Sequence, residues 1–101
     1  MTDKKILCII PARSGSKGIP DKNIRLFKEH PLMCWSIIQM QKSKFINQTR
    51  IVVSTDSKKY QEIAKQYGAE TPFLRPIEIS GDHSTDLEFM KHCLRWFQDN
   101  E

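Results

Sequence analysis

The stretch that decides the fold is residues 5–11, KILCIIP, a nearly continuous apolar run of strand length. Runs without polar alternation are typical of a central strand that is buried on both faces of a parallel sheet. Pro11 ends the run, and Gly15, Gly18 and Pro20 follow it closely. Because glycine and proline interrupt regular structure, the pattern predicts a buried strand that leads directly into a loop.

A helix and a second strand are predicted next. Residues 32–44 carry a broad apolar face, and Pro31 stands where a helix can begin without losing a needed N–H group. Residues 50–55, RIVVST, form a second β-branched run. Asp56 and Ser57 follow this run and offer a cap for another helix.

The second helix and a short third strand complete the middle of the chain. Apolar residues recur at helical spacing at Tyr60, Ile63, Ala64 and Tyr67. Gly68 follows them and predicts the C-terminal end of the helix. Residues 69–74 then predict a short strand that Pro72 interrupts.

The last segment predicts a helix with two apolar sides. Thr85 precedes Glu88 by three residues, which is the spacing of a capping box. One stripe comprises Leu87, Met90, Leu94 and Phe97, and an opposite stripe comprises Phe89, Cys93 and Trp96. A helix that is apolar on two sides needs cover on both. We expect the second stripe to be covered by something missing from these residues or by another chain.

The order strand, helix, strand, helix, strand, helix predicts an α/β fold of three βα units with a mostly parallel sheet. The length of 101 residues allows one domain, which we place at residues 1–101.

Positive charge is concentrated in one segment. The formal net charge is +4, and residues 13–28 alone carry five basic side chains and one acidic side chain. A protein that binds nucleic acid usually spreads its basic residues over a face or a helix. A single basic loop favours a compact anionic ligand instead, although an ordinary solvated turn is the alternative.

Cysteine usage and hydropathy predict a cytoplasmic protein that does not enter a membrane. Cys8, Cys34 and Cys93 are odd in number, widely spaced and set among apolar neighbours, as free thiols in a reducing compartment are. No apolar run approaches the roughly 18–20 residues of a membrane span, and the N-terminus shows no signal cleavage site.

The loop after the first strand has the chemistry of a phosphate site. Gly15 and Gly18 allow the backbone to approach a phosphate, while Arg13 offers a planar fork for its oxygens. Lys17 and Lys22 add mobile charges, and Ser14, Ser16 and Asn23 add hydrogen-bonding groups. Neither the Walker A pattern nor the GxGxxG pattern is present, so this would be a different phosphate loop.

Residues 9–23, IIPARSGSKGIPDKN, resemble the N-terminal signature of the acylneuraminate cytidylyltransferases, also called CMP-sialic acid synthetases. Further matches follow in the order and spacing of that family: IVVSTD at 51–56, YGAE at 67–70, LRP at 74–76 and GD at 81–82. The resemblance covers essentially all 101 residues.

The resemblance implies a Rossmann-like nucleotidyltransferase fold, here an incomplete portion of three βα units. It also implies a reaction in which an acidic nine-carbon sugar attacks the α-phosphate of CTP, with Mg²⁺ assisting and pyrophosphate leaving. By motif matching, Arg13, Ser16 and Lys17 would hold the triphosphate with Lys22 beside it. Arg13 and Lys17 would be catalytic, Asn23 would contact the nucleotide, and Arg75 would lie near the base.

Some features of the family have no counterpart here. In the family, a small polar residue after the position of Asp82 contacts the nucleotide. The resemblance assigns this role to the region 83–86 of this sequence and not to a particular residue. The acidic pair that binds Mg²⁺ and the element for homodimer formation have no match, so this chain would correspond to the first half or less of the enzyme. A stand-alone nucleotide- or anion-binding module without catalysis is the alternative. The sugar remains open between neuraminic, legionaminic and pseudaminic acids.

Overall fold

Two parallel strands form the centre of the molecule. The computed structural model describes residues 6–15, 21–81 and 85–100. Strand β1 (Ile6–Pro11) pairs in parallel with β4 (Thr49–Ser54), in register from the first residue of each strand to the last. The chain is therefore an α/β protein with parallel strands, as predicted.

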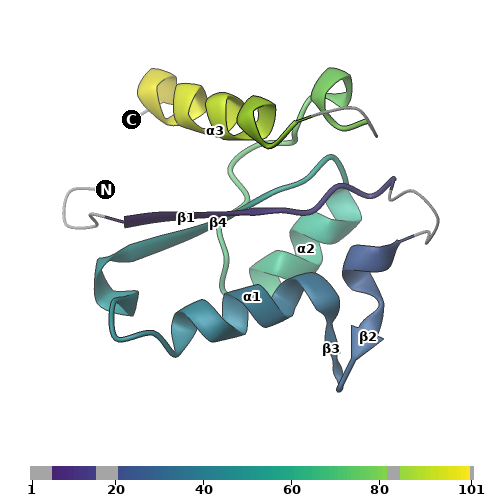
Figure 1. Cartoon of the computed structure of the whole chain (residues 1–101), viewed down its shortest axis with the longest axis vertical. Helices are drawn as coiled ribbons and strands as arrows, with labels where there is room; N and C mark the ends of the chain where they lie inside the picture. Colours follow the sequence, from purple (N-terminus) through teal and green to yellow (C-terminus); the bar gives the residue numbers. More distant parts are fainter. Residues whose placement is uncertain (1–5, 16–20, 82–84, 101) are drawn as a thin grey trace.

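Helices lie on both faces of this strand pair (Figure 1). Helices α1 (Leu32–Gln41) and α2 (Lys58–Gln66) cover one face, and α3 (Asp86–Asn100) covers the other. The larger apolar cluster lies under α1 and α2, and the smaller one, which includes Phe73 and Cys93, lies under α3. Ile51, Val52 and Val53 of β4 alternate between the two clusters, as the pleat of a strand requires, and this accounts for the apolar run at the centre of the strand.

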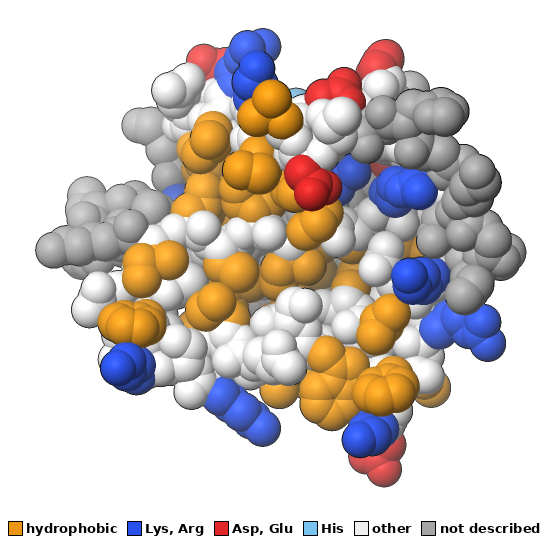
Figure 2. All heavy atoms as spheres, viewed as in Figure 1, with side chains coloured by type: hydrophobic (Ala, Val, Ile, Leu, Met, Phe, Trp, Pro, Cys, Tyr) orange, Lys and Arg blue, Asp and Glu red, His pale blue; other side chains and the backbone are white. Residues whose placement is uncertain are grey.

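Strand β1 packs against both helical layers but is hydrogen-bonded along one side. Cys8 and Ile10 contact the cluster under α1 and α2, while Leu7 and Ile9 contact the cluster under α3. Within the described residues β1 pairs only with β4, so it is an edge strand there and not the predicted central strand. An open groove lies between its free edge and α1. Figure 2 shows apolar side chains gathered across the middle of the face in view.

The predicted third strand is reduced to one parallel bridge between Val52 and Glu70. Glu70 N–H donates to the Ile51 carbonyl at 2.8 Å, and the Glu70 carbonyl accepts from Val53 N–H at 2.9 Å. Pro72 has no N–H group to extend the ladder, so pairing ends within two residues.

A short hairpin that the sequence patterns did not predict precedes α1. It joins β2 (Leu26–Phe27) to β3 (His30–Pro31) through Lys28 and Glu29, whose φ angles are 49° and 77°. The two-residue turn of type I′ requires two such left-handed residues, usually Asn and Gly. Neither Lys nor Glu signals this turn.

The two stripes of α3 are exchanged relative to the prediction. Phe89 and Cys93 are buried against the strands, and Trp96 packs beside them. Three of the four residues of the stripe taken as the packed one are instead exposed: Leu87 by 57%, Met90 by 42% and Leu94 by 50%. The fourth, Phe97, is half-buried and packs against the cluster under α3. Equal spacing of the two stripes gave no basis for choosing between them, because spacing does not tell which side of a helix faces the sheet.

The end of α2 follows its local sequence signal, whereas the end of α1 differs from the prediction. Helix α1 ends at Gln41, three residues before the predicted end. Gly68 has a φ of 95° just after α2, and a Cβ atom there would lie 2.7 Å from Gln41 Nε2. The glycine stop is therefore confirmed. Single turns of 3₁₀ helix complete the fold at Lys22–Ile24 (η1), Ile46–Gln48 (η2) and Ile77–Ile79 (η3).

The three cysteines are free thiols, with Cys34 and Cys93 buried and Cys8 half-buried. Among the described residues, no helix combines the length and the apolar character needed to cross a membrane.

Candidate functional site

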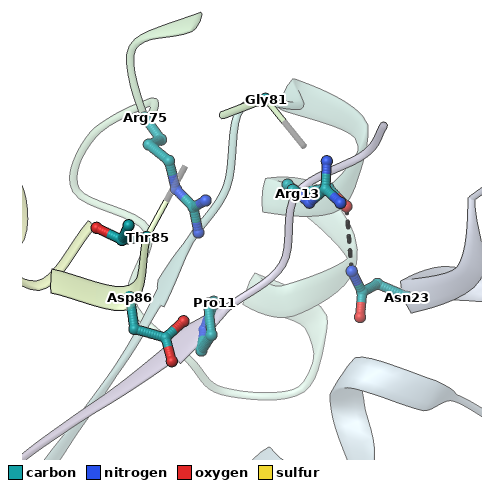
Figure 3. A pocket seen from close by; sticks show the side chains of 7 residues that line it. All are labelled: Pro11, Arg13, Asn23, Arg75, Gly81, Thr85 and Asp86. Atoms are coloured by element: carbon teal, nitrogen blue, oxygen red, sulfur yellow. Dashed lines mark hydrogen bonds between the residues drawn. The ribbon is translucent and has the colours of Figure 1, made fainter. Parts of the chain in front are cut away.

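A pocket opens at the carboxyl ends of the two central strands. Pro11 and Ser54 are register partners at the last positions of β1 and β4, so the segments that follow them leave from the same edge. In α/β proteins ligands bind at this edge. The cavity measures about 190 Å³ and is lined by Pro11, Arg13, Asn23, Arg75, Gly81, Thr85 and Asp86 (Figure 3).

Arg75 forms a buried, fixed wall of this pocket. Only 6% of the residue is exposed. Its Nε donates to Ser54 Oγ at 3.1 Å, its Nη2 donates to the Ser54 carbonyl at 2.9 Å, and its guanidinium carbon lies 5.1 Å from the Phe89 ring centre. Burial lowers the pKa of Arg75, and the carboxylates of Asp56 and Asp86 act in the opposite direction. An arginine remains protonated under these conditions, so the wall carries a positive charge.

Arg13 brings a second guanidinium to the same cavity. Its Nη1 donates to the Gly15 carbonyl at 2.7 Å, and its own carbonyl accepts from Asn23 Nδ2 at 3.1 Å. The charge of Arg13 is one of the causes that lower the Arg75 pKa, because two like charges face one cavity. Two guanidinium groups around one hollow favour an anion with several oxygens.

Three of the predicted site residues, Arg13, Asn23 and Arg75, come together in the pocket lining. Lys22 lies in η1 with its side chain exposed, and it is not among the described residues that line the cavity. Ser16 and Lys17 lie outside the described residues, so their predicted positions are not addressed by the structure.

Thr85 and Asp86 line the pocket, and the sequence pointed only to the region 83–86 that contains them. Thr85 N–H donates to Glu88 Oε1 at 2.7 Å, and Glu88 N–H donates to Thr85 Oγ1 at 3.2 Å. The predicted capping box is therefore confirmed. It places Asp86 at the first position of α3, on the pocket side opposite Arg13 in Figure 3. The capping signal could have selected these two residues from the region 83–86.

Asp56 and Ser57 were both predicted to offer a cap for α2, and only Ser57 does so. Ser57 is the cap, since its Oγ accepts from Tyr60 N–H at 3.2 Å. Asp56 instead accepts two hydrogen bonds from Ser14, one from the backbone N–H and one from the hydroxyl group, each at 2.8 Å. Its carboxylate therefore holds the segment that follows β1.

The described residues do not by themselves fit a Mg²⁺ ion. They contain no group of three or more His, Cys, Asp or Glu side chains placed to hold a metal. Asp86 is the one carboxylate among the described lining residues, and both oxygens of Asp56 are bonded to Ser14. We therefore assign no step to a metal bound by these residues.

The fold and the site define an α/β protein with a doubly cationic pocket at the carboxyl ends of parallel strands. The chain belongs to the cytidylyltransferase family, whose sequence model matches residues 7–96. The family-level resemblance of the sequence is thereby confirmed.

Curated relatives agree with this assignment. The chain is 41% identical over 97 residues to an N-acylneuraminate cytidylyltransferase of Escherichia coli O18:K1:H7, a match that covers 96% of this chain and 22% of that protein. It is 42% identical over 90 residues to a CMP-N,N'-diacetyllegionaminic acid synthase of Campylobacter jejuni, a match that covers 89% of this chain and 37% of that protein. It is 39% identical over 94 residues to a pseudaminic acid cytidylyltransferase of Campylobacter jejuni, a match that covers 93% of this chain and 40% of that protein. The chain thus spans between about a fifth and two-fifths of the length of these relatives.

Proposed function

We propose that this chain is the CTP-binding part of a cytidylyltransferase that activates a sialic-type nonulosonic acid. The observation that carries the proposal is the convergence of Arg13, Arg75 and Asn23 on one cavity at the carboxyl ends of β1 and β4. Guanidinium groups suit phosphate oxygens, and an amide suits the edge of a base or sugar. The family assignment makes a cytidine nucleotide the ligand of choice.

The proposed roles follow the sequence motif. Arg13, Ser16 and Lys17 hold the triphosphate, Lys22 lies beside it, and Asn23 contacts the nucleotide, as does Arg75 near the base. In the reaction a sugar hydroxyl forms a bond to the α-phosphorus, and the bond from that phosphorus to the oxygen bridging to the β-phosphate breaks. Arg13 and Lys17 stabilise the charge that develops on the phosphate oxygens, which is the main protein contribution to such transfers. Mg²⁺ remains part of the proposal as an ion that accompanies the triphosphate.

The acidic sugar is proposed only as a class. Relatives at 39–42% identity carry N-acylneuraminate, diacetyllegionaminic acid and pseudaminic acid in their names, so similarity over these residues does not separate the three. A homodimeric complete enzyme and a cytoplasmic location belong to the same proposal.

Isothermal titration with CTP tests the binding part of the proposal. We expect Arg13→Ala to weaken binding at least tenfold, because a charged hydrogen bond contributes about 1.5–3 kcal/mol. Arg25→Ala is the matched control, since Arg25 is exposed, has the same charge and lies outside the pocket lining. Equal losses for the two variants would mean that only overall charge matters.

A non-catalytic module that binds nucleotides or other anions is the second candidate. It is favoured by the pocket, which forms within the described residues of this chain alone. Pyrophosphate release from CTP, Mg²⁺ and a panel of nonulosonic acids separates the two. We expect little or no turnover by these 101 residues and measurable turnover by a form as long as the relatives. Binding without turnover in that longer form would favour the module.

A further inference from the structure

Two polar side chains where β4 meets α2 form hydrogen bonds to residues next to the pocket lining, although neither side chain lines the pocket itself. Asp56 accepts from Ser14, as described above, and the Tyr60 hydroxyl donates to Asp21 Oδ1 at 2.8 Å. Neither Asp56 nor Tyr60 is among the seven lining residues. Each one reaches the pocket through one intermediate residue.

The contact of Asp56 with Ser14 fixes the peptide group that follows Arg13. A peptide group is planar, so the Arg13 carbonyl and the Ser14 N–H share one rigid plane. Asp56 Oδ1 accepts from the N–H end at 2.8 Å, while Asn23 Nδ2 donates to the carbonyl end at 3.1 Å. The second carboxylate oxygen of Asp56 accepts from the Ser14 hydroxyl. Hydrogen bonds at both ends of this peptide group therefore fix the backbone at Arg13, and with it the direction of the Arg13 side chain.

Tyr60 fixes the other wall through Asp21. Tyr60 is only 1% exposed, so the surrounding core holds its hydroxyl group in one place. Burial and the neighbouring Asp21 raise the pKa of Tyr60, which keeps the hydroxyl protonated as a donor. Asp21 has a left-handed φ of 53° and accepts from Ile24 N–H at 3.1 Å, which starts the η1 turn that carries Asn23.

We propose that Asp56 and Tyr60 are positioning residues for the nucleotide, which hold Arg13 and Asn23 in their binding geometry through Ser14 and Asp21. The inference rests on the proposed function for the identity of the ligand. A group that is already held in its bound position loses less conformational freedom on binding, so affinity rises without a new contact. Half-buried Asp56 just before α2 and buried Tyr60 in its first turn in this way support the binding site from behind.

Two conservative substitutions test the proposal by titration with CTP. Asp56→Asn keeps the shape of the side chain but replaces one acceptor by a donor, and Tyr60→Phe removes only the hydroxyl group. We expect each variant to raise the Kd for CTP about tenfold, the size of effect seen when residues that orient a ligand-binding group are changed. Ser57→Ala is the matched control, because it removes the cap of the same helix between the two positions. It should leave the Kd within about twofold while lowering the stability of the fold. Unchanged Kd values for Asp56→Asn and Tyr60→Phe would overturn the proposal.

A double-mutant cycle separates positioning from general destabilisation. If Asp56 acts through Arg13, Asp56→Asn weakens CTP binding much less when Arg13 is already alanine. Losses that multiply in the double variant would show that Asp56 does not act through Arg13, and would overturn that part of the proposal.

The free protein provides a readout that does not depend on the ligand. In ¹H–¹⁵N NMR spectra, Asp56→Asn should move the Ser14 backbone amide signal, and Tyr60→Phe should move the Asn23 side-chain amide signals. Ser57→Ala should move neither. If the parent chain does not bind CTP, the proposed function is wrong. The same amide signals still show whether Asp56 and Tyr60 hold Ser14 and Asn23 in place. Signals that stay in place in both variants would overturn the positioning role.

Discussion

Arg75 and Ser54 are joined by two hydrogen bonds that use both the side chain and the backbone of the serine. Arg75 Nε donates to Ser54 Oγ at 3.1 Å, and Nη2 donates to the Ser54 carbonyl at 2.9 Å. Because Ser54 is the last residue of β4, the pair fixes a positive charge at the carboxyl end of the sheet. The same pair of hydrogen bonds therefore stabilises the fold and positions the arginine wall of the pocket.

Arg75→Lys should damage both stability and binding. A lysine ammonium group cannot make both bonds in the fork geometry of arginine, and it would be buried with unsatisfied neighbours. We expect the free energy of unfolding to fall by about 2 kcal/mol in urea denaturation and CTP binding to weaken. Arg25→Lys, at an exposed position, should change stability by less than about 0.5 kcal/mol. Similar values for the two variants would contradict a structural role for Arg75.

The hairpin turn before α1 should become more stable with glycine. Glu29 has a φ of 77°, a conformation that is strained for residues with a side chain and relaxed for glycine. We expect Glu29→Gly to raise the free energy of unfolding by up to about 1 kcal/mol. Glu62→Gly is the matched control, since Glu62 lies within α2, where glycine costs about 1 kcal/mol. A loss of stability at both positions would mean that the turn is not strained.

Local and distant determinants explain which parts of the fold were predictable. The capping box at Thr85 and the stop at Gly68 were predicted because a few adjacent residues determine them. The turn at Lys28 and Glu29 was missed, because these residue types do not favour the left-handed conformation that both adopt. A hydrogen bond of 2.6 Å from Trp35 Nε1 to the Phe27 carbonyl joins the hairpin to α1.

The candidate site was predictable where it followed the first strand and less so elsewhere. Arg13 and Asn23 were chosen from one contiguous loop, and the structure places both in the pocket lining with Arg75. The bonds from Ser14 to Asp56 and from Tyr60 to Asp21 join residues 42 and 39 positions apart, and no local pattern records such pairs.

Alkaline pH should weaken the fold through its buried thiols. Burial raises the pKa of Cys34 from 9.0 to about 11. Between these values the unfolded chain releases a proton that the folded chain retains, so the free energy of unfolding falls as pH rises. The contribution is fully present below pH 9 and amounts to roughly 1–3 kcal/mol. Denaturation between pH 8 and 11 should show a shallower decline for Cys34→Ala than for the parent. Parallel pH profiles would indicate that the thiol ionises equally in both states.

The orientation of α3 can be tested by truncating one residue on each of its apolar sides. Phe89 is 7% exposed and packs over the Arg75 guanidinium, whereas Leu94 is 50% exposed on the opposite stripe of the same helix. We expect Phe89→Ala to lower the free energy of unfolding by about 3–5 kcal/mol, because it leaves a cavity and uncovers a buried charge. Leu94→Ala should change it by less than about 0.5 kcal/mol, since solvent already reaches that side chain. A larger effect at Leu94 than at Phe89 in urea denaturation would mean that the helix turns its other face to the strands.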